Sequence, residues 1–447
     1  MRKYSRYEKY KPSNIDWLGE IPEHWDVKRA RFMLILNPSP HEITLSATQE
    51  VSFIPMEAIG ENGQLCLEQT RPIADVSSGY TYFRENDITF AKITPCFENG
   101  KAAKMCHLLN NCGFGTTELT VLRCSSRLNN AYLFYIIKSE LFRKNGEAWM
   151  YGAGGQKRVP DEFVKNFRFA FPPLSEQQKI ADFLDRETAK IDSLIQKRND
   201  LIKLLQEKRS AVISHAVTKG IDPTVRLKPS NIDWLGEIPE HWEVKNLKFL
   251  GTALIGLTYS PDDVVDENYL GKKYLVLRSS NIQNNKIELS DTVFVTKEIP
   301  QELKVQKDDI LICARNGSRL LVGKSARINS ALPNTTFGAF MTVFRSKINP
   351  FLSFYFNSNQ FQSQTTIFLT TTINQLTNHD LNEVWVSVPP LSEQQEIVDF
   401  LDRETAKIDS LIKKEKKIIK KMKEYRTALI SAAVTGKIDV RGEVAHE

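Results

Sequence analysis

The sequence lacks the features of membrane and secreted proteins. No apolar run approaches the roughly 18 residues that a membrane-spanning helix needs, and the first residues, MRKYSRYEKY, contain no apolar stretch typical of a secretory signal. Cysteine is scarce, because only six occur and no two of them stand in a CxxC spacing. We therefore expect a soluble cytoplasmic protein whose thiols are reduced and buried rather than bound to a metal.

A large excess of charge of one sign is also missing. The 60 Lys and Arg residues against 54 Asp and Glu give a net charge of +6, which permits binding to a polyanion without requiring it. Hydrophobic content of 41% and a charged fraction of 26% are ordinary for a globular protein and exclude disordered and fibrous classes. A length of 447 residues exceeds what one hydrophobic core usually organises, so two or three domains are predicted.

What the sequence does contain is an internal repeat with a period of 217 residues. The segment KPSNIDWLGEIPEHW occupies residues 11–25 and recurs without change at residues 228–242. A second segment, PPLSEQQKIADFLDRETAKIDSLIQK at residues 172–197, recurs at residues 389–414 with three changes. Because a repeat dictates architecture, the chain is expected to be one structural unit written twice.

Two inserts of equal length, residues 29–171 and 246–388, lie between the repeated segments and share little sequence. Repeated segments need the same packing in both copies, whereas inserts that differ are expected to recognise different things. Runs of β-branched or aromatic residues between turn residues predict strands, and two apolar segments predict helices. The expected strands are residues 51–55, 87–91, 119–123, 274–278, 310–314 and 341–344, and the expected helices are residues 132–137 and 352–356.

Each PPLSEQQ segment is predicted to begin a long helix. Two prolines precede it, and Ser175 with Gln178 has the pattern of an N-cap and capping box, which Ser392 and Gln395 repeat. Apolar residues then recur at steps of three, four and seven and form one stripe toward a partner. The stripes are Ile180, Leu184, Ile191, Leu194, Leu201, Leu205 and Val212, and in the second copy Ile397, Leu401, Ile408, Leu411, Ile418, Met422 and Leu429.

The two helices are expected to pair in antiparallel fashion. Each runs some 40 residues, about 60 Å at 1.5 Å per residue, before Gly220 or Gly436 ends it. Only the short segment 218–227 connects the first helix to the second repeat, so the second insert begins at the far end of that helix. The second helix is therefore expected to return alongside the first, with one insert at each end. The predicted fold class is α+β, with two mixed α/β domains separated by a pair of long antiparallel coiled-coil helices and a pseudo-twofold internal repeat.

The repeat also predicts the domain boundaries. The first domain comprises residues 1–171 with a docking segment at 11–28, followed by the first spacer helix at 172–219, the second domain at 220–388 with its docking segment at 228–245, the second spacer helix at 389–436 and a tail at 437–447. Apolar residues of the docking segments are expected to pack each insert onto the helices. These residues are Trp17, Leu18, Ile21 and Trp25, and in the second copy Trp234, Leu235, Ile238 and Trp242.

This order of insert, PPLSEQQ helix, insert and PPLSEQQ helix resembles the specificity subunit of a type I restriction-modification system, over essentially the whole chain. Residues 87–88 with 100–102, and residues 309–311 with 323–325, resemble landmarks of that family's target-recognition domains. The resemblance implies that each insert reads one half of a bipartite DNA site and that the helices set the gap between the halves. The chain would itself have no catalytic function and no cofactor.

The resemblance further implies partners. Two methyltransferase subunits would bind the helical frame, adenine would be the methyl acceptor, and restriction/translocase subunits would join the complex. Those partners would use S-adenosylmethionine, ATP and Mg²⁺.

Base recognition has its own chemical requirements. Arg and Lys match guanine, and Asn and Gln match adenine, in the major groove, while further cations contact phosphates. Identical recognition domains on a twofold frame would require a palindrome, so two different inserts predict an asymmetric site. The candidate DNA-binding residues are Arg84, Lys92, Lys101, Lys104, Gln156, Lys157 and Arg158 in the first insert, and Lys272, Lys273, Arg278, Asn281, Arg315, Asn316, Arg319 and Lys324 in the second.

Two other classes of function stay open on the sequence alone. One is a self-contained DNA methyltransferase or nuclease with an unrecognised catalytic domain, and the other is a coiled-coil scaffold whose inserts bind proteins. Against an enzyme, no set of nucleophile, base and orienting group stands at an interpretable spacing. Residues 317–325 imitate a phosphate-binding loop, but five residues separate the glycines where four are required.

Overall fold

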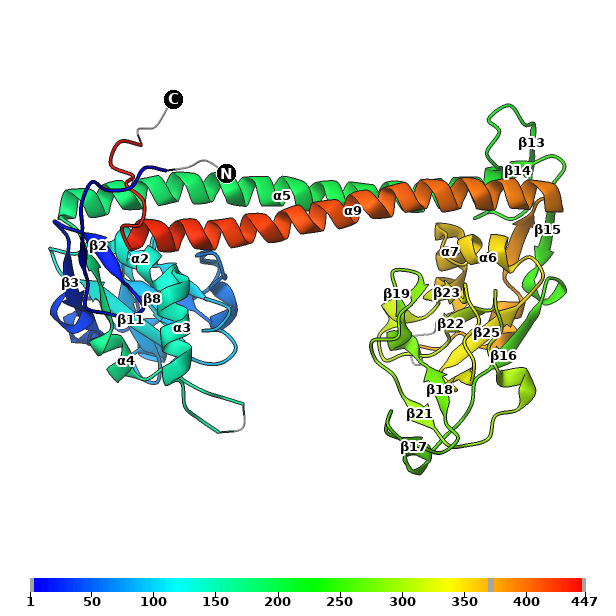
Figure 1. Ribbon diagram of the computed structural model, residues 1–447, viewed down its shortest axis with the longest axis horizontal. Coiled ribbons are helices and arrows are strands. Elements are labelled where there is room, and N and C mark those ends of the chain that lie inside the picture. Colours follow the sequence, from blue (N-terminus) through cyan, green and yellow to red (C-terminus); the bar gives the residue numbers. More distant parts are fainter. Residues whose placement is uncertain (1–3, 154, 369–373, 444–447) are drawn as a thin grey trace. The chain divides into compact units, whose positions relative to one another are not determined.

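The computed structural model describes residues 4–153, 155–368 and 374–443 (Figure 1). The chain divides into two compact units. Unit 1 consists of the residues up to Arg198 together with those from Lys417 onward, and unit 2 consists of Asn199–Lys416. Each unit contains one insert, one docking segment and a part of each long helix.

The two long helices are α5, Leu174–Lys219, and α9, Leu391–Val434. Both begin one residue before the serine of the PPLSEQQ segment, so the predicted capping boxes are wrong. The amides of Glu176 and Gln177 both donate to the carbonyl of Pro173 at 2.9 Å, and the Gln177 side chain donates to the carbonyl of Pro172, also at 2.9 Å. The proline carbonyls therefore start the helix, and Ser175 lies inside its first turn.

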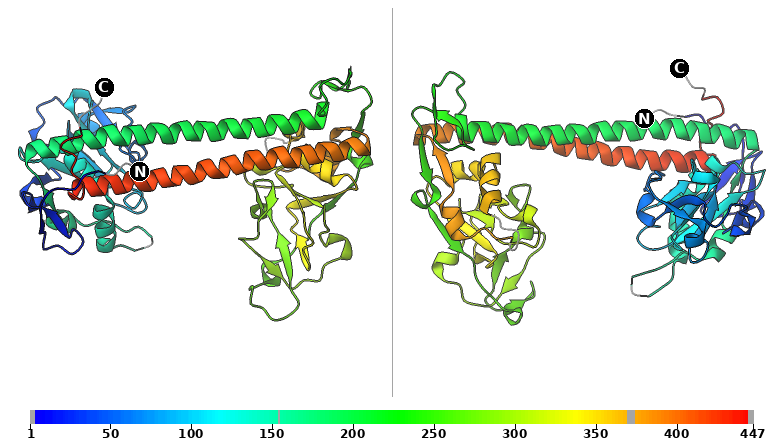
Figure 2. Two further views of the ribbon diagram at one scale, coloured as in Figure 1. Left: turned by 45° about the horizontal axis from the view of Figure 1, so that its top comes forward. Right: turned by 180° about the vertical axis from the view of Figure 1, so that it is seen from behind.

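The helices are antiparallel in each unit. In unit 1 the first turns of α5 share a core with the last turns of α9, and Arg426 binds Asp192 at 2.9 Å. In unit 2 the last turns of α5 share a core with the first turns of α9, and the repeat-equivalent pair, Arg209 and Asp409, lies at 3.0 Å. Both views in Figure 2 show the red end of α9 beside the start of α5 within unit 1. The antiparallel prediction is confirmed.

The buried face of each helix follows a period of 11 residues rather than 7. Ile180, Ile191, Ile202 and Ile213 are all buried on α5, and Ile397, Ile408, Ile419 and Ile430 repeat the pattern on α9. By contrast Leu194, Leu201 and Leu411 of the predicted stripes are 41–48% exposed. A spacing of 11 corresponds to 3.67 residues per turn, close to the 3.6 of a straight α-helix, whereas steps of seven drift off one face. The predicted stripes are therefore wrong in the middle of each helix.

Unit 1 holds two four-stranded sheets. One has the order β4-β11-β8-β9 and is antiparallel, and the other has the order β6-β5-β10-β7 with one parallel pair, β5 and β10. Helix α2 packs on the first sheet. The bounds are β4 Leu34–Leu36, β11 Leu119–Cys124, β8 Ile88–Ala91, β9 Ala102–Lys104, β6 Thr70–Pro72, β5 Glu50–Ile54, β10 Cys112–Gly115, β7 Thr81–Arg84, α1 Ile73–Val76, α2 Asn130–Lys138, α3 Glu140–Trp149 and α4 Asp161–Asn166.

Unit 2 repeats this plan despite its different sequence. Its sheet β16-β25-β22-β23 has the strand order of β4-β11-β8-β9, and the sheet β17-β21-β18-β24 again contains one parallel pair, β18 and β24. All six predicted strands and both predicted helices fall on elements of these units. The bounds are β16 Thr252–Ile255, β25 Met341–Arg345, β22 Ile310–Cys313, β23 Ser325–Arg327, β17 Val264–Val265, β21 Phe294–Val295, β18 Tyr274–Leu277, β24 Thr335–Phe337, β19 Ile282–Gln283, β20 Lys286–Ile287, α6 Asn349–Tyr355, α7 Asn359–Phe368 and α8 Asn378–Asn382.

The docking segments join the two ends of each insert. Strand β3 (Asp26–Arg29) pairs with β12 (Arg168–Phe171), and β15 (Glu243–Asn246) pairs with β26 (Trp385–Val388). Ahead of them lie the pairs β1 (Tyr10–Pro12) with β2 (Glu20–Pro22), and β13 (Leu227–Pro229) with β14 (Glu237–Pro239). Trp25 and Trp242 have no exposed surface and belong to the cores of units 1 and 2. The predicted docking role of these segments is confirmed.

The glutamate of each PPLSEQQ segment ties the docking segment to its helix. Oε2 of Glu176 lies 2.8 Å from Nε2 of His24, and Oε1 accepts a hydrogen bond from the Tyr7 hydroxyl at 2.6 Å. In the second copy Oε2 of Glu393 lies 2.7 Å from Nε2 of His241 and accepts a hydrogen bond from the Trp242 indole at 3.0 Å. The histidine–glutamate contact is thus the same in both copies, whereas the second donor to the glutamate is Tyr7 in the first copy and Trp242 in the second.

Candidate nucleic-acid interface

The aspartates among the sequence landmarks are structural. Asp87, just before β8, is 2% exposed and accepts hydrogen bonds from Arg123 at 2.9 and 2.7 Å. Asp309, just before β22, has the same exposure and accepts hydrogen bonds from Arg345 at 2.8 and 2.7 Å. Paired and buried in this way, the two carboxylates hold neighbouring strands together and have no surface for a ligand.

The candidate residues of unit 1 separate into two groups along β8. Those at its end are Lys92, Lys101, Gln156, Lys157 and Arg158, and those near its start are Arg84 and Lys104. The first group meets there because the segment after Trp149 returns to the end of β8. Its Lys157 carbonyl accepts a hydrogen bond from the Thr94 amide at 2.9 Å, and Val159 donates to the carbonyl of Lys92 at 2.8 Å.

Several cations of unit 1 are already bound within the protein. Nη2 of Arg158 lies 2.7 Å from Oε1 of Glu118, and this hydrogen bond lowers the pKa of the Glu118 carboxyl below its usual value. Lys101 donates to the carbonyl of Met56 at 3.0 Å, and Arg84 lies 3.3 Å from Glu42. These side chains must exchange an internal partner for DNA, which reduces the net gain on binding.

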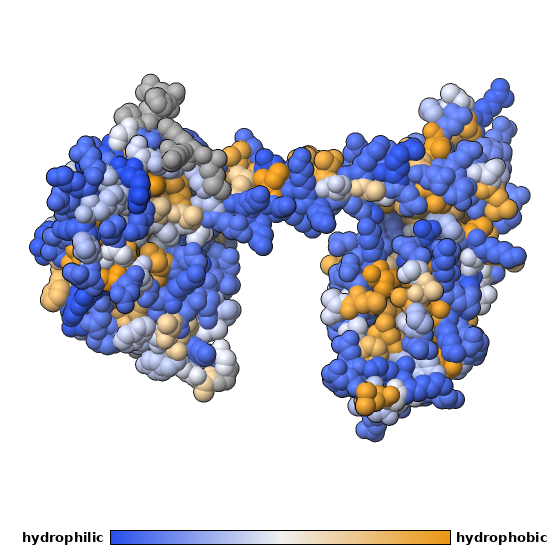
Figure 3. Space-filling view, viewed as in Figure 1, coloured by the Kyte–Doolittle hydropathy of each residue, from blue (hydrophilic) through white to orange (hydrophobic). Residues whose placement is uncertain are grey.

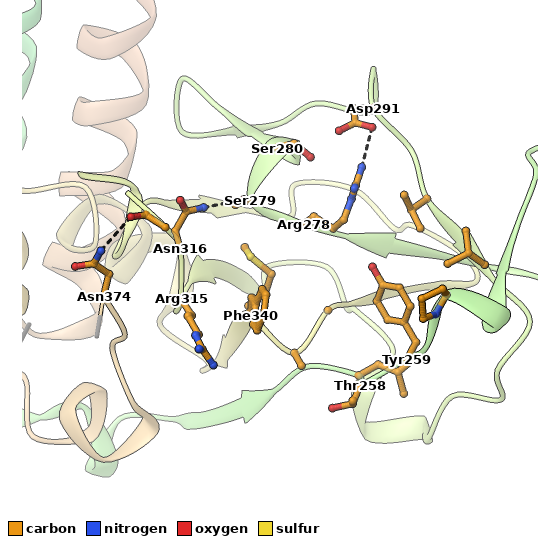
Figure 4. Close-up of a pocket in the computed structure, with 18 residues that line it drawn as sticks. Thr258, Tyr259, Arg278, Ser279, Ser280, Asp291, Arg315, Asn316, Phe340 and Asn374 are labelled. Carbon is orange, nitrogen blue, oxygen red and sulfur yellow. Dashed lines mark hydrogen bonds and ion pairs between the residues drawn. The ribbon is translucent and has the colours of Figure 1, made fainter. Parts of the chain in front are cut away.

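Three candidates of unit 2 line one cavity of about 1210 Å³, drawn in Figure 4. Arg278 and Asn316 are held in place, Arg278 by Asp291 at 2.7 Å and Asn316 through its Nδ2, which donates to the Ser279 hydroxyl at 3.3 Å. The third is Arg315. Residues that were not predicted also line it, including Thr258, Tyr259, Ser280, Phe340 and Asn374.

Arg315 differs from its neighbours because its guanidinium has no hydrogen bond or ion pair in the described part of the chain. It lies over the ring of Phe340, with Cζ 5.2 Å from the ring centroid, and Phe340 is 61% exposed. Figure 4 shows the two side chains next to each other in the cavity, with Tyr259 on the other side of the Phe340 ring. On the face of unit 2 that Figure 3 shows, apolar side chains gather in patches between polar ones.

The remaining candidates of unit 2 lie outside this cavity. Nζ of Lys272 lies 3.0 Å from Oε1 of Glu298, Lys273 donates to the carbonyl of Tyr269, and Arg319 donates to that of Thr366. Lys324 follows Gly323, whose φ of 85° shapes the turn before β23. This set is therefore dispersed over the unit.

Asn281 has to be removed from the candidates. Its side chain is 1% exposed, and its Oδ1 accepts a hydrogen bond from the amide of Arg278 at 2.8 Å. Its Nδ2 donates to the carbonyls of Glu288 and Asp291 at 3.0 and 2.8 Å. With all of these bonds inside the fold, the amide braces a turn and is not available to an adenine.

Equivalent positions of the two units carry different chemistry. The amide of Lys92 donates to the carbonyl of Glu118 at 2.9 Å, and the amide of Ala314 donates to the carbonyl of Phe340 at 3.0 Å. Glu118 and Phe340 therefore occupy the same place in the fold. One is a carboxylate paired with Arg158, and the other is an aromatic platform under Arg315.

Sequence reasoning missed Glu118, Tyr259, Phe340 and Asn374. No local pattern marks them, because each lies in a loop whose position is set by strand pairing across the sheet. The number of residues between such a loop residue and its neighbouring strand could locate it. That number can be compared only after the two inserts are aligned by their structures, because their sequences diverge.

Two absences concern the described residues only. No group of three or more His, Cys, Asp or Glu side chains among them comes together as a metal site would. In the same part of the chain no helix combines the length and the apolar character that crossing a membrane requires.

Comparison with known proteins identifies relatives. The family model of the type I restriction modification DNA specificity domain matches residues 40–204 and 239–421. The EcoAI specificity subunit of Escherichia coli is 44% identical over 164 residues, which are 36% of this chain and 27% of that relative. The EcoKI specificity subunit of Escherichia coli (strain K12) is 32% identical over 210 residues, or 45% of this chain and 44% of the relative. The chain therefore matches less than half the length of these two relatives.

Longer matches are more distant. The putative MjaX specificity subunit of Methanocaldococcus jannaschii is 24% identical and covers 98% of both chains. A solved chain from work on complex assembly and conformational transition of the type I R-M system has a TM-score of 0.73 at 18% identity and covers 95% of this chain and 99% of that one. The HsdS subunit of Thermoanaerobacter tengcongensis has a TM-score of 0.50 at 17% identity and covers 94% and 98%. These solved structures share the fold.

Proposed function

Because the chain belongs to the family of type I restriction-modification specificity subunits, we propose that it reads an asymmetric bipartite DNA site, with one half-site for each unit. The observation that carries the proposal is the contrast between frame and inserts. Both copies of the frame make the same histidine–glutamate contact, between His24 and Glu176 and between His241 and Glu393. The inserts share strand order yet present a paired carboxylate in one unit and an aromatic platform in the other.

The asymmetry follows from this difference. A pseudo-twofold protein places two domains on two stretches of duplex, and identical domains would read identical sequences in opposite directions. Glu118 and Phe340 occupy the same place and cannot make the same base contacts. A carboxylate accepts hydrogen bonds from cytosine, whereas an aromatic ring contacts a thymine methyl or supports an arginine.

The long helices set the gap between the half-sites in this proposal. At 1.5 Å per residue, the 46 residues of α5 extend about 69 Å. Pairing along both helices, through two equivalent Arg–Asp ion pairs and the buried isoleucines, makes each segment of the pair stiff.

The partners are part of the same proposal. Two methyltransferase subunits bind the repeated frame, one for each copy, and restriction/translocase subunits complete the complex. S-adenosylmethionine, ATP and Mg²⁺ serve these partners, and this chain supplies the sequence recognition without chemistry of its own. Adenine is the methylated base.

The test uses the chain bound to its methyltransferase partner. Binding to duplexes in which each base pair is changed in turn should identify two short blocks separated by positions without preference, and affinity should fall steeply with salt. Replacing residues 246–388 by the insert of a relative should change one block alone. Binding that ignores base changes in both blocks would refute the proposal, and methyl transfer or cleavage by the chain alone would favour a self-contained enzyme.

A further inference from the structure

We propose that the cavity of unit 2 receives the edge of a G·C base pair and that Arg315 is the residue that reads its guanine. This inference rests on the proposed function. It adds to that function the base that is read, the residue that reads it and the position of the contact in unit 2. It is carried by the guanidinium of Arg315, which is exposed inside a cavity of about 1210 Å³.

The guanidinium of Arg315 is available to a new acceptor. Arg278 in the same cavity is paired with Asp291, and Lys272 outside it is paired with Glu298. Arg315 has no such partner in the described part of unit 2, so it binds a new acceptor without giving up an old one. A cation that is already paired would lose its ion pair on binding DNA, and this loss would reduce the net gain from the new contact.

The shape of a guanidinium matches the major-groove edge of guanine. Guanine presents O6 and N7 in the major groove, and a planar guanidinium matches them with two parallel hydrogen bonds. The Arg315 guanidinium lies against the Phe340 ring, with Cζ 5.2 Å from the ring centroid, and a contact with an aromatic ring uses none of its N–H donors in a hydrogen bond. An aromatic support also reduces the number of rotamers that the long side chain must lose on binding.

Hydrogen bonds fix the backbone around Arg315. The Arg315 amide donates to the carbonyl of Phe340 at 3.0 Å, and the amide of Asn316 donates to that of Asn374 at 3.3 Å. The side chain of Asn374 then donates to the carbonyl of Gly317 at 3.1 Å. Positions that distinguish bases need a fixed backbone, whereas contacts to phosphates tolerate a mobile one. This network favours a base over a phosphate as the partner of Arg315.

Unit 1 offers a contrast at the equivalent place. There Glu118 replaces Phe340, and the nearby arginine, Arg158, is bound to it at 2.7 Å. No unpaired arginine stands on an aromatic ring in the described part of that cluster. The guanine contact is therefore specific to unit 2 and contributes to the difference between the two half-sites.

The experiment measures base preference in the complex of the chain with its methyltransferase partner. Binding is measured for duplexes with each base pair of both half-sites replaced, and the half-site read by unit 2 is assigned by exchanging residues 246–388. In Arg315→Ala the preference for G·C at one position of that half-site should fall on the order of 10- to 100-fold. Arg315→Lys should lose part of it, and Phe340→Leu should weaken preference at the same position.

Two controls separate a base contact from general electrostatics and from misfolding. Lys248→Ala removes a cation of the same unit that lies outside the cavity and is not one of the candidate DNA-binding residues, and it should leave every base preference unchanged. The half-site read by unit 1 serves as an internal control in each variant, because a folding defect in unit 2 does not produce a loss confined to one base pair.

Three results would overturn the inference. One is an equal loss of affinity for all sequences in Arg315→Ala, with a salt slope smaller by about one, which identifies a phosphate contact. Another is unchanged preference at every position of the half-site of unit 2 while the wild-type chain reads both half-sites. The third is a half-site of unit 2 without any G·C preference. If the wild-type complex reads neither half-site, the proposed function fails as well, and this outcome is distinct from the others.

Discussion

Lengthening both long helices by two of their 11-residue periods should move the half-sites apart by one turn of DNA. The change inserts two further copies of residues 192–202 into α5 and two further copies of residues 409–419 into α9. These segments end in Ile202 and Ile419, so each copy continues the spacing of the buried isoleucines. The added 22 residues extend each helix by about 33 Å at 1.5 Å per residue.

The expected shift follows from the geometry of both polymers. At 3.4 Å per base pair, about 33 Å corresponds to about 10 base pairs, close to one turn of 10 to 10.5. Over 22 residues at 100° per residue the helix ends rotate by only about 40°, so the recognition domain meets the same face of the duplex. The gap should therefore grow by about 10 base pairs, while the bases read in each half-site stay the same.

A single extra period in each helix is the matched comparison. It adds about 16 Å, or about 5 base pairs, which is half a turn, so a recognition domain would face the wrong side of the duplex. We expect this variant to bind weakly at every gap length. Both variants should show added helix by circular dichroism.

The assay is binding to a set of duplexes whose gap increases in single base-pair steps, together with the methylated motif in cells that contain the partner. If the longer variant is folded and the gap stays constant, or if a half-site sequence changes, the helices do not set the gap. Failure of both variants to bind any duplex while retaining the partner would also contradict the reasoning.

Three further predictions concern stability. Gly436→Ala should lower the free energy of unfolding by about 1–2 kcal/mol, because the φ of Gly436 is 69° and a Cβ would lie 2.4 Å from the ring of Pro22. Gly220 has a similar φ of 77°, but a Cβ there would lie no closer than 3.2 Å to a Glu393 carboxylate oxygen and 3.5 Å to the Trp242 ring, so Gly220→Ala should cost less. Asp309→Ala leaves the guanidinium of Arg345 without its carboxylate partner and should cost about 3–5 kcal/mol in chemical denaturation. Burial lowers the pKa of Lys138 to about 7 in the folded protein. Between pH 7 and 10 the unfolded chain therefore binds more protons than the folded one, so the free energy of unfolding increases as pH rises. The stability of the wild type relative to Lys138→Met should accordingly increase over that interval by roughly 3–5 kcal/mol, and a difference independent of pH would contradict this assignment.

The frame could be predicted well because its signals are local. Proline pairs before each helix, Gly220 and Gly436 after them and the tryptophans of the docking segments act through the backbone or through burial at short range. The predicted strands were also found, since runs of β-branched and aromatic residues between turn residues favour extended structure.

The two errors in the long helices have different causes, one local and one that depends on the partner helix. Ser175 and Gln178 matched a capping box, but the helix begins at Leu174 and the carbonyl of Pro173 accepts its first backbone hydrogen bonds. Leu194 and Leu201 matched a heptad, but a nearly straight helix pair buries Ile191 and Ile202. Local hydrogen bonds decide the helix start, whereas packing against the partner helix decides which of the two apolar patterns is buried.

The candidate DNA-binding residues show the same limit more strongly. Choosing charged and amide side chains near loops included Arg315, which is exposed in a cavity, but it also included Asn281, which is buried in a turn. Whether an arginine is paired depends on residues far away in the chain, as Glu118 with Arg158 illustrates.

The amino-acid sequence alone determined the twofold plan of this protein, the antiparallel helices and the division into constant frame and variable inserts. These properties follow from repetition and from hydrophobic periodicity, which are written along the chain. Tertiary structure alone decided which face of each helix is buried, that the landmark aspartates are strand braces, and that Phe340 lies beneath Arg315. Such properties depend on pairs of residues brought together by sheet formation, and no pattern along the chain encodes a distance between them.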